Sequence, residues 1–170
     1  MHFCLNCMKR LFSVHDNKNR TAEKEGNEMQ QDTVHLLQDC SAGITMALAT
    51  IDGILPNVKD QTLRKKLKDS VSTHHRIQEE TRAMLASLGG QDKAPGAMAK
   101  GMSWLVTNAK MALGDDTTAA YLVADGCDMG VKSLCRSRNR YPAAQREAQD
   151  LAEQLIDCEE TLSASMRPFL

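Results

Sequence analysis

The chain has 170 residues, a formal net charge of -1 and only 4% aromatic residues. This length accommodates one hydrophobic core, and the balanced charge gives no electrostatic reason to expect nucleic acid as a partner. Few aromatics together with plentiful Ala, Leu and Met favour aliphatic packing between helices over β-strands. We find no uninterrupted apolar run of about 18 residues, so the sequence predicts no membrane partner.

Residues 1–28 differ from the rest of the chain, because they are polar, lack helical periodicity and contain too few apolar side chains to fold alone. One hypothesis is a disordered segment. The other is that the DNA encoding residues 24–26, Lys-Glu-Gly, contains a bacterial ribosome-binding sequence and that translation begins at Met29. The preceding residues would then be upstream DNA read as protein. In both cases we expect the folded domain to span 29–170.

The six cysteines favour a reducing compartment. Only Cys4 and Cys7 are close in sequence, whereas the other four lie inside helical patterns without the spacing of a disulfide framework. The amino terminus is a poor match to a signal peptide. We therefore expect free thiols and a cytoplasmic location.

Two long amphipathic helices are predicted in the first half of the domain. The first covers about 32–54 and is capped by Asp32 or Thr33. The second covers about 60–90 and ends at Gly89, where a left-handed C-cap costs little. Its inward positions follow the four-three alternation of a bundle helix, at Leu63, Leu67, Val71, His74, Gln78, Thr81, Leu85 and Leu88.

A second hairpin is predicted after a long connection, which contains a short apolar helix at about 103–113. The next helix covers about 117–138 and is capped by Asp116 or Thr117, and Pro142 is expected at the first position of the last helix. Two hairpins joined by one crossover predict an all-α, up-down four-helix bundle with an extra helix in the crossover.

This order of segments resembles the ferritin-like superfamily over roughly residues 30–170. The resemblance is carried by the 88–90 end of the second helix, Trp104 in the crossover, residues 114–116 before the third helix and the paired hairpins. Di-iron members of the superfamily place a Glu on two helices and Glu-x-x-His on the other two. Here the first helix has no Glu, and Glu-x-x-His occurs nowhere in the chain. The resemblance therefore implies the fold of a bacterial ferritin-like branch without its iron chemistry.

A layer of Cys and His residues at mid-height is the first candidate site. Counting from the turns places Cys40 level with His74, and Cys127 level with Cys158, each on a different helix. Three thiolates and an imidazole suit Zn²⁺ or another soft divalent cation. The alternative is structural, because a buried Cys packs as a small hydrophobe and an inward His usually bonds a backbone carbonyl or Gln78.

The second candidate site is His75 with Glu79, four residues apart on one face of the second helix. Together with acids of the second hairpin they would provide the oxygen-rich ligands of a hard metal site. These acids are Asp125, Asp128, Asp157 and Glu159. The alternative is a solvated face with an intrahelical pair, because the Glu count and spacing of a di-iron centre are missing.

The crossover helix is the candidate interaction surface. Its apolar residues would either cap the bundle or pack against a second copy of the chain, and the ones singled out are Met98, Met102, Trp104 and Leu105. This surface predicts a homodimer, and the identity of any other protein partner does not follow from the sequence.

The sequence thus predicts a non-catalytic cytoplasmic bundle that has a structural or protein-interaction role and requires no cofactor. The alternative is a metal-binding or redox bundle, with zinc or iron held by the Cys and His layer or by the carboxylates. Metal content and visible absorption distinguish the two.

Overall fold

The computed structural model describes residues 4–91 and 115–170, with side chains from residue 23 onward. In these ranges the chain forms four α-helices and no β-strand, which confirms the predicted all-α class. The helices are α1 (Cys4–Ile54), α2 (Gln61–Ser87), α4 (Asp116–Arg140) and α5 (Arg146–Met166), with short 3₁₀ turns at Leu55–Asn57 and Arg167–Phe169. The extra helix predicted in the crossover lies outside the described residues.

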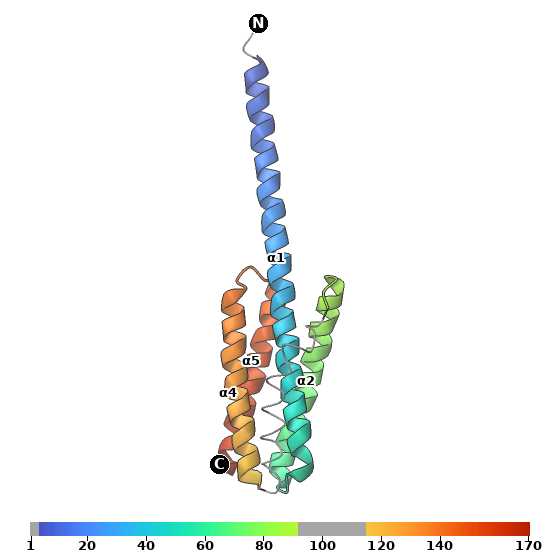
Figure 1. Cartoon of the computed structure of the whole chain (residues 1–170), viewed down its shortest axis with the longest axis vertical. Helices are drawn as coiled ribbons and strands as arrows, with labels where there is room; N and C mark the ends of the chain where they lie inside the picture. Colours follow the sequence, from blue (N-terminus) through green and yellow to red (C-terminus); the bar gives the residue numbers. More distant parts are fainter. Residues whose placement is uncertain (1–3, 92–114) are drawn as a thin grey trace.

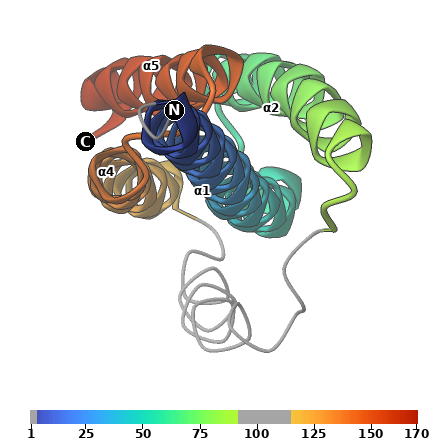
Figure 2. The same ribbon diagram turned by 90° about the horizontal axis from the view of Figure 1, so that it is seen from above.

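The four helices pack side by side as two antiparallel hairpins, α1 with α2 and α4 with α5 (Figure 1). α2 and α4 run in the same direction, so the connection between them passes from one end of the bundle to the other. Seen end-on, α1 lies between α2 and α4 (Figure 2). α1 and α5 contact each other and both remaining helices. This is the four-helix bundle that the two predicted hairpins require.

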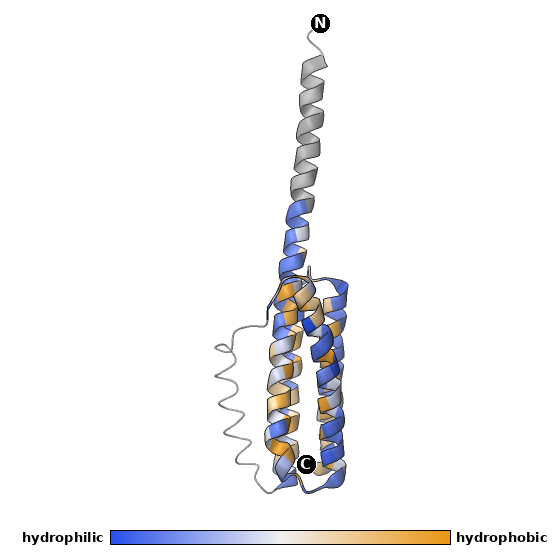
Figure 3. Cartoon of the chain, turned by 90° about the vertical axis from the view of Figure 1, so that its right-hand side faces the viewer, coloured by the Kyte–Doolittle hydropathy of each residue, from blue (hydrophilic) through white to orange (hydrophobic). Residues whose placement is uncertain are grey.

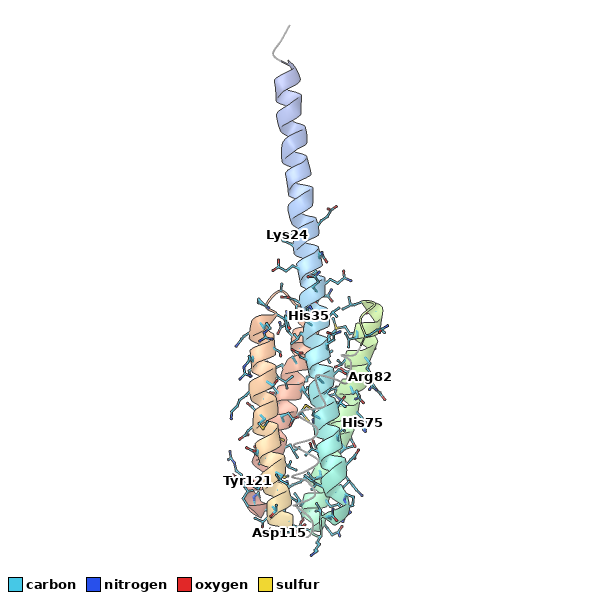
Figure 4. The ribbon with its side chains drawn as sticks, viewed as in Figure 1. Lys24, His35, His75, Arg82, Asp115 and Tyr121 are labelled. Carbon is cyan, nitrogen blue, oxygen red and sulfur yellow. The ribbon has the colours of Figure 1, made fainter. Side chains whose placement is uncertain are left out.

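Three aspartates fix the lower end of the bundle, where Asp115 is labelled in Figure 4. The Asp60 carboxylate caps α2 by accepting two backbone N–H groups of its first turn, at 2.7 and 2.8 Å. Asp115 caps α4 in the same way, in place of the predicted Asp116 or Thr117. Asp116 instead accepts the N–H groups of Lys59 and Asp60, both at 2.8 Å, and so ties the α1–α2 connection to α4.

At the upper end, α1 holds the loop between α4 and α5. The Asp32 carboxylate accepts the N–H of Ala143 at 3.1 Å, and the Thr33 hydroxyl oxygen accepts the N–H of Gln145 at 2.8 Å. The prediction that Asp32 or Thr33 caps the first helix is wrong, because α1 continues through both residues. Pro142 lies in this loop, and α5 begins four residues after it.

α1 begins at Cys4, well before the start predicted near Asp32, and its upper part rises above the bundle (Figure 1). The backbone of residues 4–28 is therefore helical rather than irregular, since a helix that is already nucleated extends at little cost. Every residue from 23 to 31 is exposed. A native translation start at Met29 stays a prediction.

Figure 3 shows hydrophobic and hydrophilic residues alternating along the helices of the bundle. Most charged side chains are exposed, and the buried side chains are mainly apolar. They form two clusters stacked along the bundle. The upper cluster includes Leu37, Cys40, Ile44, Ile77, Leu151 and Leu155, and the lower one includes Ile51, Leu63, Leu67, Val123, Cys127 and Leu162. The inward positions predicted for α2 are all buried or half-buried, and Gly89 has the expected positive φ of 68°.

One helix of the described chain is long and apolar enough to cross a membrane by length and composition alone. It covers Glu23–Asn57, with an 18-residue window of mean hydropathy 1.2. A single helix of this kind is weak evidence for a membrane, because the core helix of a bundle passes the same test.

Truncating a side chain in the lower cluster should destabilise the bundle. Leu67 is 0% exposed, so Leu67→Ala removes packing contacts and leaves a cavity, and we expect a loss of about 2–5 kcal/mol in the free energy of unfolding. Urea denaturation followed by circular dichroism measures it. Leu170→Ala, at a position that is 57% exposed, is the control and should change stability by less than about 0.5 kcal/mol. Equal losses in both variants would contradict this packing.

Candidate functional site

A pair of ionisable side chains lies where the two hydrophobic clusters meet. His74 on α2 is 0% exposed and Glu159 on α5 is 5% exposed. The His74 Nε2 atom lies 3.2 Å from Glu159 Oε1. Each residue occupies an inward position of its helix, between apolar residues one turn before and one turn after it. The interior of the bundle therefore contains a polar layer that links the two hairpins.

The other ring nitrogen of His74 is also engaged. Its Nδ1 atom lies 2.9 Å from the Ser70 carbonyl oxygen, 3.2 Å from Ser70 Oγ and 3.7 Å from Cys158 Sγ. A carbonyl oxygen only accepts hydrogen bonds, so this contact assigns a proton to Nδ1. The expectation that an inward His bonds a backbone carbonyl is therefore correct, and the carbonyl belongs to the preceding turn of the same helix.

The surroundings of His74 favour its charged form. Burial alone would lower its pKa, but the hydrogen bonds of the ring with Cys158 and Glu159, together with the charge of these groups, outweigh burial and raise the pKa from 6.5 to about 10. At neutral pH His74 is thus an imidazolium, and it faces Glu159. A buried charge is tolerated when it is paired and hydrogen-bonded in this way.

α4 supplies two further contacts to Glu159. Cys127 lies near the Glu159 carboxylate, and the pKa of its thiol is raised, mainly by burial and then by the Glu159 charge. A Cβ atom added at Gly130 would lie 3.5 Å from Glu159 Cδ and 3.6 Å from Oε1. The glycine backbone therefore packs directly against the carboxylate, and Cys127 stays protonated.

Three of the four residues predicted for the mid-height layer belong to it, and Cys40 does not. Gly43 faces Leu155, and α1 runs parallel to α5, so Cys40 is level with a point on α5 about seven residues, or roughly 10 Å, above Glu159. Cys40 belongs to the upper cluster, where burial and then the Asp39 charge raise its pKa to about 12. Counting residues from the turn placed Cys40 level with His74. This was wrong, because residues 55–60 form a 3₁₀ turn and an extended stretch that alter the stagger of α1 and α2.

The second predicted site does not assemble as expected. His75, which is labelled in Figure 4, and Glu79 are exposed on α2. Three of the four acids proposed to join them are also exposed, on α4 and α5. These three are Asp125, Asp128 and Asp157. The fourth acid, Glu159, is buried, and it pairs with His74 rather than with His75.

The polar layer has donor atoms of the kinds that bind metals, but their directions diverge. Cys158 faces Nδ1 of His74 and Glu159 faces Nε2, and these two nitrogens point away from each other. A single ion bound to one nitrogen of His74 could therefore not be bound by both Cys158 and Glu159. Within residues 23–91 and 115–170, no group of three or more His, Cys, Asp or Glu side chains is arranged to hold a metal ion.

A groove runs between α1 and α4, with a volume of about 470 Å³. Its inner wall reaches α5 at Glu159 and Leu162, and Cys127 lies beside them. The groove thus passes over the outer edge of the polar layer. The predicted interaction residues lie outside the described residues, and they are Met98, Met102, Trp104 and Leu105.

The His74–Glu159 pair was not found from the sequence, although a signal for it exists. Leu155, Glu159 and Leu162 follow the spacing of one inward helix face, which places a carboxylate among apolar residues on α5. His74 occupies the corresponding face of α2. An acid and an imidazole on the inward faces of two helices indicate a buried pair, because either one alone would be costly to bury.

No protein-family model matches the chain, and no curated protein matches it significantly. Among solved structures, the chain is similar to the crystal structure of a DUF305 fragment from Deinococcus radiodurans, with a TM-score of 0.60 and 17% sequence identity. The match covers 81% of this chain and 93% of that chain. At this identity the similarity supports an all-helical bundle fold and carries no functional assignment.

The pH dependence of stability should report the buried pair. The pKa of His74 is about 10 in the folded chain and 6.5 without its partners, so its stabilising contribution is complete below pH 6.5 and is lost as the pH rises to about 10. Glu159→Gln removes the carboxylate charge and keeps the shape. We expect its free energy of unfolding, measured in urea at a series of pH values, to fall less steeply over this range than that of the wild type. Equal slopes in the two proteins would contradict the pairing.

Native-state thiol modification should separate the cysteines by burial. Cys135 is exposed, whereas Cys40 and Cys127 are buried and have raised pKa values. Because the thiolate is the reactive form, a thiol reagent should modify Cys135 at least tenfold faster than the other two. Peptide mass spectrometry over time measures each rate, and the same reaction in urea is the control that should make the rates similar. Rapid native modification of Cys127 would contradict its burial.

Proposed function

We propose that this chain is a non-catalytic four-helix-bundle scaffold with a structural or protein-interaction role. One observation carries the proposal: the polar groups at its centre are bound to one another. His74 is fully buried and both of its ring nitrogens have protein partners, and its partner Glu159 is itself buried. A catalytic acid or base must instead reach a substrate with a lone pair or a transferable proton.

The buried thiols support the same proposal. The pKa values of Cys40 and Cys127 are raised, so both groups are protonated at neutral pH. A protonated thiol is a weak nucleophile and a weak metal ligand. The four described cysteines are free, which suits the cytoplasmic location that we propose for the chain.

We place this scaffold in a ferritin-like architecture that lacks the di-iron ligands. The support is the order of two hairpins around one crossover, together with the missing acids. Between residues 32 and 54, α1 carries no Glu, and the buried His74 is not part of a Glu-x-x-His sequence. In this proposal the pair of His74 and Glu159 occupies the level of the bundle where a metal centre would otherwise lie.

The alternative function is a metal-binding or redox bundle, and one observation favours it. His74, Cys127, Cys158 and Glu159 lie in one layer and include the thiolate, imidazole and carboxylate donors that zinc or iron would use. Binding would require Cys127 to lose its proton and His74 to release one of its partners, so metal affinity would be coupled to both steps.

Metal analysis decides between these functions. Protein purified without chelator should contain less than about one tenth of an equivalent of zinc or iron and should lack visible absorption, because the donors bond one another. Elemental analysis and absorption spectroscopy measure this.

Cys127→Ser removes a layer thiol, and Cys135→Ser removes an exposed thiol as the matched control. About one bound metal per chain that is lost in Cys127→Ser and retained in Cys135→Ser would replace the scaffold proposal with the metal-binding alternative.

A further inference from the structure

The groove between α1 and α4 is apolar along its lower part, and charged side chains line its upper end, namely Asp39, Arg136 and Arg140. In the lower part its α1 wall consists of small and aliphatic residues, and its α4 wall includes two glycines. The residues that line these walls include Ala42, Gly43, Met46, Ala47, Val123, Gly126 and Gly130. Small residues on facing helices leave room for a third helix to approach closely, so the shape of the groove suits a helical occupant.

The chemistry of α1 indicates that this wall is built to be covered. From Cys40 to Ile51 the helix contains no charged residue on any face. The hydroxyl groups of Thr45 and Thr50 donate to carbonyl oxygens one turn earlier, both at 2.8 Å, so they need no water. A helix that is apolar all round requires neighbours on every side. α2, α4 and α5 provide three of these neighbours, and the groove is the remaining side.

The connection between α2 and α4 has to pass along the bundle. At the upper end, Gln38 Nε2 donates to the Gln91 carbonyl oxygen at 2.7 Å, which places the end of the first described range beside α1. The second range resumes at Asp115 at the lower end, where the next residue holds Lys59. Residues 92–114 therefore join the two ends of the bundle, and α1 lies between the helices that they connect (Figure 2).

The opposite face offers a much less suitable path. The hollow between α2 and α5 is lined by charged and polar side chains, among them Lys66, Asp69, Arg76, Gln154 and Asp157. Burying these groups under an apolar segment would remove their hydration without replacing it. Of the two faces, the α1–α4 groove is the one that matches the composition of residues 92–114.

The lengths also agree. From Gln38 to Ile54, α1 advances about 24 Å at 1.5 Å per residue. Residues 98–113 would cover about 24 Å as one helix. In that stretch Met98, Met102 and Leu105 share the spacing of one helix face, so they can meet a single groove.

From these observations we infer that the α1–α4 groove is the docking site of the chain's own segment 92–114, whose apolar face covers α1. The segment is tethered at both ends within reach of the groove, so its effective concentration there exceeds that of a second copy of the chain. This inference is independent of the proposed scaffold function, because it concerns the outer face of α1 and not the polar layer.

Trp104 reports on this docking, because it is the single tryptophan of the chain. We expect the wild-type protein to emit at the short wavelengths of a buried indole, to resist acrylamide quenching and to keep both properties on dilution. Ala47→Arg places a charge in the groove wall and should shift the emission to longer wavelength and increase quenching at least threefold. Ala83→Arg, on the exposed face of α2, is the matched control and should behave as the wild type does.

A second groove variant tests whether misfolding, rather than loss of docking, explains the effect of Ala47→Arg. A side chain added at Gly126 meets open space, so Gly126→Glu introduces a charge without a clash, and circular dichroism should confirm its helix content. It should expose Trp104 as Ala47→Arg does. A wild-type Trp104 that is already quenched as in urea would overturn the inference. So would protection that disappears on dilution together with a dimer seen by light scattering, because a second copy would then be the occupant.

Discussion

The pairing of two opposite charges inside an otherwise apolar bundle constrains the rest of this structure. His74 and Glu159 lie between an upper and a lower hydrophobic cluster, and residues of α2, α4 and α5 surround them. Leaving either charge without its partner would cost several kcal/mol, about 3–5 in comparable buried pairs. Sliding α2 along α5 by one turn would separate the pair. The register between the two hairpins is therefore tied to this contact.

The same contact limits the chemistry that the interior can perform. The imidazole is held between a carbonyl of its own helix and a carboxylate of another, and the protonated Cys127 thiol lies near that carboxylate. Groups arranged in this way stabilise one another's charge state, which is the opposite of the poised, accessible state that catalysis requires. The similarity to a DUF305 fragment agrees with the bundle fold and leaves the function to be argued from this layer.

α1 imposes a second constraint, because it contacts all three other helices. Its end near Asp32 anchors the α4–α5 loop, and the connection at its other end is held by Asp116 of α4. Between these anchors, from Cys40 to Ile51, it carries no charged residue, and this stretch includes the face that α2, α4 and α5 leave uncovered. The groove over that face and the polar layer are therefore adjacent, and Glu159 lines the inner wall of the groove.

Hydrophobic spacing alone determined that this chain is helical, how its hairpins follow one another and which side of α2 faces inward, because these properties depend on residues three and four apart. The sequence also placed His74, Cys127 and Cys158 on inward faces. Only the tertiary structure decided which of them meet: it moved Cys40 about two turns away and brought Glu159 to His74. The physical reason is that periodicity defines the face of a helix but not its height against a neighbour. That height is set by the hydrogen bonds of the connecting segments and by the burial of charge in pairs.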